Sequence, residues 1–105
     1  MDIFTALADP QRRNIIEALH SRGKLSIKQL TMDSAVTRQA ITKHLNILIK
    51  AKIVQADFIG KERIHKLNPK AMQSLFNWLA PFAQKWDDRL NNLAKYIGDQ
   101  DENTK

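Results

Sequence analysis

The 105-residue sequence contains no cysteine, and it has only three glycines and three prolines. Without thiols the chain has no disulfide framework, no thiolate metal site and no thiol nucleophile. No apolar run approaches the roughly 18 to 20 residues that a membrane span requires, and the first residues lack the basic-then-apolar layout of a secretory signal. We therefore expect a cytoplasmic protein with no membrane partner.

The sequence also lacks the residue patterns that carry catalysis. It has no paired carboxylates at a pocket-forming spacing, no glycine-rich phosphate loop and no nucleophile beside a base. His20 and His65 are each isolated from a paired ligand at helical spacing, which argues against a histidine metal site. We expect no enzymatic activity, no catalytic residue, no metal ligand and no cofactor.

Positive charge is abundant and unevenly distributed. Hydrophobic residues make up 43% and charged residues 27% of the chain, the mix of a globular protein, and the length suits one domain. The formal net charge is +6, and residues 38–70 alone hold eight basic residues against Asp57 and Glu62. These basic residues are Arg38, Lys43, Lys50, Lys52, Lys61, Arg63, Lys66 and Lys70. Such a segment indicates either a nucleic-acid surface or an ordinary solvated face.

Apolar spacing and capping residues predict four helices in the first half of the chain. Asp9 before Pro10, then Ser26 and Thr37, are typical residues at helix starts, and Gly23 is typical of a helix end. The predicted helices cover residues 2–8, 10–22, 27–32 and 38–51. The last two are short, joined by a few residues, and the second is polar and basic near its start, which indicates a helix-turn-helix.

A hairpin and a long helix are predicted in the second half. Residues 53–59 and 63–67 are β-prone runs separated by Gly60, Lys61 and Glu62, and a hairpin directly after a recognition helix is a wing. A helix opens near Lys70, and Pro81 should kink it or divide it in two. Its apolar stripe consists of Leu75, Leu79, Phe82, Trp86, Leu90, Leu93 and Ile97. The fold class is therefore mainly α with a small β-hairpin, a winged helix-turn-helix over residues 1–97, with a disordered acidic tail over 98–105.

Three segments together resemble the ArsR/SmtB family of bacterial repressors. They are ALADPQRRNIIEAL at residues 6–19, TRQAITKHLNIL at 37–48 and KLNP at 66–69. The resemblance extends to about Ile97. It implies a dimeric winged helix that represses transcription by occupying operator DNA.

The metal sites of this family are missing from the sequence. Ser26 and Lys28 stand where members that sense arsenic, lead or cadmium carry cysteines, and no histidine follows His65 to match the members that bind zinc on the last helix. The segment at residues 78–96 instead resembles the metal-independent branch of the family. This resemblance implies repression without a metal effector, and it leaves any small-molecule effector unknown.

Residues of the recognition helix and wing are the predicted contacts to double-stranded DNA. Arginine can bind guanine and glutamine can bind adenine through paired hydrogen bonds, whereas threonine, lysine and histidine can also serve phosphates. The predicted DNA-binding residues are Thr37, Arg38, Gln39, Thr42, Lys43, His44, Lys61 and Arg63. The plainer alternatives are a polar helix face, a solubilising hairpin tip and a structural His44. Arg12 and Arg13 are left out of the site, because a structural ion pair and a phosphate contact explain them equally well.

The apolar stripe of the last helix predicts a homodimer. From Leu75 to Ile97 an unbroken helix would extend about 35 Å, more than a body of some 70 residues can readily cover. The alternative is that all seven apolar positions pack within one chain. The predicted dimer interface consists of Ile3, Phe4, Leu7, Phe82, Trp86, Leu90 and Leu93.

The sequence thus predicts a homodimeric repressor whose recognition helices enter successive major grooves of a palindromic operator. The main rival is a protein-interaction module that uses the winged helix as a docking surface. That rival would bind no specific operator and would tolerate replacement of Arg38 and Gln39 by alanine.

Overall fold

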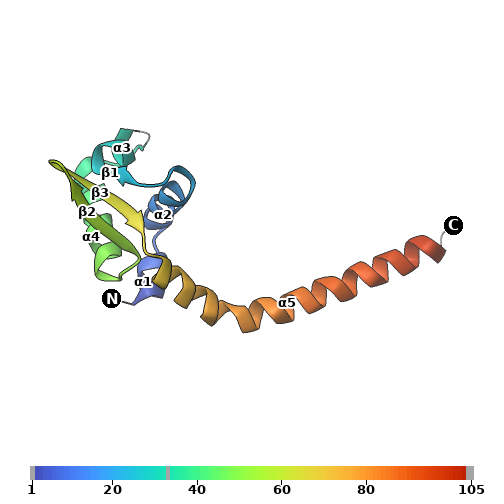
Figure 1. Cartoon of the computed structure of the whole chain (residues 1–105). Coiled ribbons are helices and arrows are strands. Elements are labelled where there is room, and N and C mark those ends of the chain that lie inside the picture. The colour runs from blue at the N-terminus through green and yellow to red at the C-terminus, as the bar shows by residue number, and fades with distance from the viewer. Residues whose placement is uncertain (1, 33, 104–105) are drawn as a thin grey trace. The chain divides into compact units, whose positions relative to one another are not determined.

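The computed structural model of the chain describes residues 2–32 and 34–103, and it gives the backbone alone for Leu90 and residues 93–103. The chain divides into two compact units, Met1–Gln73 and Ser74–Lys105. The elements in chain order are α1 (Ile3–Leu7), α2 (Pro10–Arg22), β1 (Leu25–Ser26), α3 (Ile27–Met32), α4 (Arg38–Lys50), β2 (Val54–Ile59), β3 (Glu62–Leu67) and α5 (Pro69–Asn103) (Figure 1).

The second helix begins at the predicted residue, Pro10, and the first begins at Ile3, one residue later than predicted. The Asp2 carboxylate accepts a hydrogen bond from the backbone N–H of Thr5 at 2.8 Å, which caps α1. Asp9 caps α2 in the same way, and Pro10 occupies the first helical position, where no backbone donor is needed. Gly23 ends α2 with a φ of +85°, a conformation that glycine adopts at little cost.

The third helix is fixed by a reciprocal pair of hydrogen bonds. The Ser26 hydroxyl accepts from the backbone N–H of Gln29 at 3.2 Å, and the Gln29 side-chain oxygen accepts from the backbone N–H of Ser26 at 2.9 Å. This capping box satisfies two backbone donors at the start of α3. It also orients α3 against α4, with which it forms the helix-turn-helix.

A small antiparallel sheet in the order β1-β3-β2 completes the first unit. The sequence did not predict that β1 pairs with β3, with Leu25 opposite His65. The hairpin turn is shorter than predicted: Gly60 and Lys61 form it, and Glu62 already belongs to β3, opposite Ile59. Gly60 has a φ of +64°, which suits the first position of a two-residue turn.

One apolar core holds the first unit together. Its buried residues come from helices α1 to α4, from strands β1 and β2, and from Ile53 just before β2. They are Ala6, Ile15, Leu19, Leu25, Leu30, Ile41, Leu45, Leu48, Ile53 and Val54. Ala71 and Met72 at the start of α5 pack against this core. The arrangement confirms the predicted fold class, mainly helical with a small sheet and a projecting β2–β3 wing (Figure 1).

Helix α5 runs through Pro81 without a break, which excludes one of the two predicted alternatives, division of the helix in two. Within the described residues, no helix has the length and apolar character needed to cross a membrane. The predicted boundary between a folded part and an acidic tail at residues 97–98 stays a prediction, because the side chains there lie outside the described residues.

Candidate nucleic-acid interface

The outward face of α4 is determined by its buried face. Ile41, Leu45 and Leu48 recur at intervals of four and three residues, and each is no more than 3% exposed. Because these intervals match the helical period, the opposite side of α4 must face solvent. The exposed polar residues of α4 are Arg38 at its start and Gln39, Lys43, Asn46 and Lys50 along the side opposite the buried one.

Three of the predicted base-contacting residues surround one open hollow. Arg38, Gln39 and Thr42 line a depression of about 380 Å³ on the first turns of α4. The Thr42 hydroxyl donates to the backbone carbonyl of Arg38 at 2.9 Å, which orients that side chain along the helix. The arrangement leaves a guanidinium and a carboxamide side by side, the two groups that best match guanine and adenine edges.

Thr37 has a structural role at the start of this surface. Its hydroxyl oxygen accepts a hydrogen bond from the backbone N–H of Ala40 at 3.2 Å and caps α4. The N-terminal end of a helix carries a partial positive charge, so this exposed end of α4 also favours a phosphate.

His44 lies differently from the other predicted contacts on α4. It is half-buried, and its Nδ1 atom is buried without a hydrogen-bond partner among the described residues. Burial raises the pKa of Asp9, but hydrogen bonds from the backbone N–H groups of Arg12 and Gln11 outweigh this effect and hold the pKa below its usual value. The charge of His44 lowers the pKa of Asp9 further. The ring is therefore close to the start of α2, a placement that fits the structural alternative better than a DNA contact.

The wing carries cations and, unexpectedly, large apolar side chains near its tip. Lys61 is exposed in the turn and Arg63 is half-exposed on β3, as a wing contact requires. Phe58 and Ile59 are 72% and 62% exposed on β2. Sequence reasoning took these two residues only as strand formers, because the β-prone pattern does not show how far the hairpin extends beyond the core.

His65 belongs to the core and not to a metal site. The side chain is fully buried, and its Nδ1 atom forms a 3.1 Å hydrogen bond with the backbone carbonyl of Leu25, which links β3 to β1. Burial lowers the pKa of His65, the nearby Arg63 charge lowers it further, and the bond to Leu25 opposes both. Among the described residues no three histidine, aspartate or glutamate side chains are grouped as a metal would require.

Arg12 and Arg13 fix α1 to α2. The Nε atom of Arg12 donates to the carbonyl of Ala6 at 2.7 Å, and a terminal guanidinium nitrogen of Arg13 donates to the carbonyl of Leu7 at 2.6 Å. These carbonyls belong to the last turn of α1, where no intrahelical donor is available. The two arginines therefore cap α1, a role that was not among the two predicted for them.

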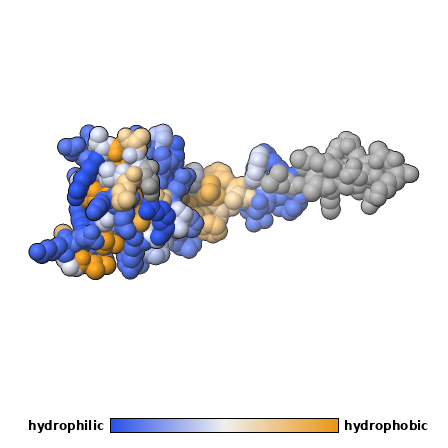
Figure 2. Space-filling view, turned by 90° about the horizontal axis from the view of Figure 1, so that it is seen from above, coloured by the Kyte–Doolittle hydropathy of each residue, from blue (hydrophilic) through white to orange (hydrophobic). Residues whose placement is uncertain are grey.

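The predicted dimer residues divide between half-buried and exposed positions. Ile3 and Leu7 are half-buried, whereas Phe4 is 45% exposed. Phe82 and Trp86 are 59% and 60% exposed on α5, and the Phe82 ring lies 5.0 Å from that of Trp78. The side chains of Leu90 and Leu93 lie outside the described residues. Figure 2 shows apolar surface on the first turns of the projecting part of α5 and hydrophilic surface on the turns that follow.

Comparisons with known proteins agree with this geometry. Residues 9–56 match the profile described as "bacterial regulatory protein, arsR family". Over 101 residues the chain is 33% identical to the HTH-type transcriptional regulator Rv2034 of Mycobacterium tuberculosis, covering 96% of this chain and 91% of that protein. The chain belongs to the ArsR family.

The chain is also similar over most of its length to a second relative and to a solved structure. It is 29% identical over 89 residues to the transcriptional repressor SdpR of Bacillus subtilis, covering 85% of this chain and 98% of that protein. The solved structure of an ArsR-like transcriptional regulator from Rhodococcus sp. RHA1 matches with a TM-score of 0.69 and 31% identity, covering 87% of this chain and 85% of that one. The predictions of a winged helix-turn-helix and of a DNA-binding transcriptional regulator that is not an enzyme are thus confirmed.

Proposed function

We propose that the chain is a homodimeric repressor that reads a palindromic operator through the major groove and acts without a metal effector. The observation that carries this proposal is the hollow at the start of α4, which is lined by Arg38, Gln39 and Thr42, while the apolar residues of the same helix are buried. A recognition helix needs hydrogen-bonding side chains at its exposed start and an apolar underside that holds this face outward.

Each polar group has a distinct task in this proposal. Arg38 donates two hydrogen bonds to a guanine, and Gln39 exchanges two with an adenine, each pair contributing roughly 1 to 3 kcal/mol of discrimination. Lys43 and the capped start of α4 at Thr37 bind phosphates, which positions the helix without reading sequence. Lys61 and Arg63 bind the flanking backbone or minor groove from the wing. His44, which is half-buried, is proposed to have a structural role and no direct contact with DNA.

A second copy of the chain is the proposed partner of the apolar face of α5. Phe82 and Trp86 are each more than half exposed, and burying such a side chain contributes roughly 2 to 3 kcal/mol. Phe4 of α1 is exposed to a similar extent and is proposed to join the same interface, with Ile3, Leu7, Leu90 and Leu93. Large apolar patches on soluble proteins usually mark interaction sites.

The proposed independence from metals rests on the chemistry of the residues present. The family includes the arsenical resistance operon repressor of Bacillus subtilis, to which the chain is 32% identical over 74 residues. Here Ser26 is buried in the capping box of α3, and the chain has no thiol to bind a soft metal ion. We propose that this regulator works in the cytoplasm, where the operator is.

Selection of bound fragments from a pool of random duplexes by the purified chain tests this function. We expect enrichment of imperfect inverted repeats whose half-site centres are separated by about one helical turn, 10 to 11 base pairs. Enrichment of single, unpaired half-sites would contradict the symmetric dimer. No enrichment over the starting pool would contradict DNA reading altogether and would favour the protein-interaction module.

A further inference from the structure

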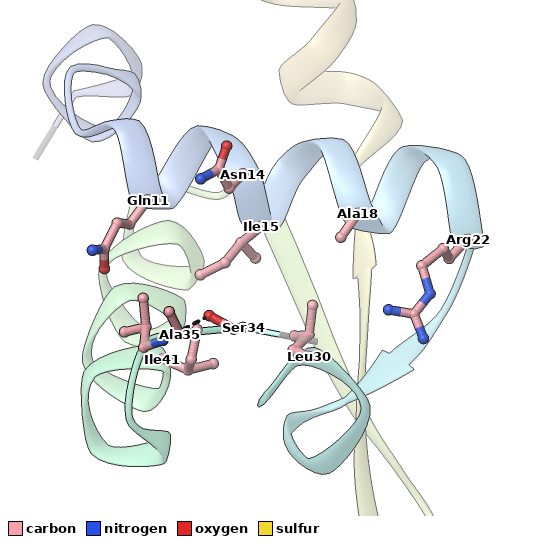
Figure 3. Close-up of a pocket in the computed structure, with 10 residues that line it drawn as sticks. Gln11, Asn14, Ile15, Ala18, Arg22, Leu30, Ser34, Ala35 and Ile41 are labelled. Atoms are coloured by element: carbon pink, nitrogen blue, oxygen red, sulfur yellow. Dashed lines mark hydrogen bonds between the residues drawn. The ribbon is translucent and has the colours of Figure 1, made fainter. Parts of the chain in front are cut away.

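A groove separates α2 from the helix-turn-helix. Its volume is about 380 Å³, within the range of 300 to 1,000 Å³ that is usual for small-molecule sites. One wall is α2, and the other is formed by α3, the turn at residues 34–36 and α4 (Figure 3). The turn contributes Ser34, Ala35 and Val36 to the lining, and the Ser34 hydroxyl accepts from the backbone N–H of Val36 at 3.0 Å.

The lining is apolar in the middle and polar toward the ends. Ile15 and Ala18 of α2 face Leu30 of α3 and Ile41 of α4 across the middle of the groove (Figure 3). Polar amides, those of Gln11 and Asn14, lie near the start of α2. The Arg22 guanidinium lies at its other end, eleven residues further along, which corresponds to about 16 Å of helix.

We propose that this groove binds a small carboxylic acid with an elongated apolar body. Arg22 offers five N–H donors in a planar fork that matches a carboxylate, so it can serve a ligand in addition to acceptors within the protein. The apolar middle removes the body of the ligand from water, and the two amides accept or donate to a polar substituent at its far end. The net charge of +6 favours an anion over a neutral or cationic ligand of the same shape.

Occupancy of the groove is coupled to DNA binding through α4. Ile41 lines the groove from the buried side of α4, while Arg38 and Gln39 lie on the outward side of the same turns. A ligand that contacts both α2 and Ile41 biases the position of the recognition helix, and its charge opposes a nearby phosphate. This coupling rests on the proposed function, whereas binding of the acid does not. Because coupling is reciprocal, operator DNA must weaken ligand binding by the factor by which the ligand weakens DNA binding.

The binding claim is tested with three probes of one shape and different charge: 4-phenylbutyrate, 4-phenylbutan-1-ol and 4-phenylbutylamine. Titrations of the full-length protein followed by amide chemical shifts should show saturable binding of the acid, with the largest shifts at residues lining the groove. The alcohol should bind about tenfold more weakly and the amine more weakly still. Equal affinity for all three, or shifts confined to α5, would overturn the proposal.

Two substitutions and a matched control make the assignment specific. Arg22→Gln should weaken binding of the acid about tenfold and leave the alcohol unchanged within about twofold, because only the acid uses the guanidinium. Ala18→Leu fills the groove and should weaken both ligands. Arg89→Gln removes the same charge from an exposed position of α5 and should change neither. If Arg22→Gln and Arg89→Gln behave alike, the groove is not the site.

The coupling claim is tested by measuring operator affinity with and without saturating 4-phenylbutyrate. We expect a loss of about fivefold or more in wild-type protein and none in the Arg22→Gln variant at the same concentration. Groove binding without a change in operator affinity would overturn the coupling. Failure to bind any operator in the absence of ligand would instead overturn the proposed function and leave the binding result standing.

Discussion

The surroundings of a side chain decide its role in this regulator. Arg38 and Gln39 are exposed at the start of α4, because the apolar residues of that helix are buried in the core. The surroundings of Arg12 and His44 depend instead on tertiary packing around the start of α2. The donors of Arg12 meet carbonyls of α1, six and seven residues earlier in the chain, and no periodic pattern indicates such a contact.

His65 makes the stability of the fold depend on pH. Burial lowers the pKa of this side chain below its ordinary value of 6.5, so the folded state favours the neutral ring more than the unfolded chain does. The associated stability is complete above about pH 6.5 and is lost as the pH falls below it, at no more than about 1.4 kcal/mol per pH unit. Urea unfolding between pH 8 and pH 5 measures this loss.

The variant His65→Gln isolates the contribution of His65 to the pH dependence of stability. Glutamine keeps a donor for the Leu25 carbonyl but does not titrate, so the variant should lose less stability on acidification than the wild type. Identical pH dependence of the two proteins would show that the buried ring is not the origin of the effect.

At the scale of elements, local signals predicted the helices well and the sheet only partly. The starts of α3 and α4 follow from the caps at Ser26 and Thr37, because a cap needs only residues within three positions. Strand β1 has two residues and no periodicity, and its pairing with β3 joins residues forty positions apart, Leu25 and His65. The hollow on α4 was anticipated through its residues, whereas the groove beside α2 depends on tertiary packing and could not be predicted.

The wing should contribute affinity without sequence preference. Lys61→Gln removes an exposed cation from the tip and should weaken binding to all duplexes alike, and the slope of log affinity against log salt should decrease in magnitude by about 1 per removed phosphate contact. Glu62→Gln at the next position removes a negative charge and should have the opposite effect on affinity. Affinity measured on an operator and on an unrelated duplex checks both. A loss confined to the operator would show that Lys61 reads bases.

At the scale of the whole molecule, two features are separated along the chain. The net positive charge lies in residues 38–70, which include α4 and the wing, and the largest exposed aromatic side chains lie on α5. Positive charge attracts DNA, and exposed apolar surface favours association with another protein chain. A symmetric pair would place two recognition helices on one duplex, which explains why both features belong to one regulator.

Association through α5 is tested by replacing its exposed aromatic residues. Sedimentation equilibrium of the wild type should give twice the chain mass of 12.1 kDa. The double variant Phe82→Ser with Trp86→Ser should be monomeric at micromolar concentration and bind operator weakly. Gln84→Ser with Asn91→Ser changes exposed polar positions of the same helix and should remain dimeric. A monomeric wild type would contradict the homodimer.

Operator reading by α4 is tested by the ratio of affinities for a selected operator and for competitor DNA, compared between the wild type and the double variant Arg38→Ala with Gln39→Ala. Two lost base contacts in each subunit predict that this ratio falls about 100-fold or more, while affinity for competitor changes far less. An unchanged ratio would contradict the account, because α4 would then not be the element that reads the operator.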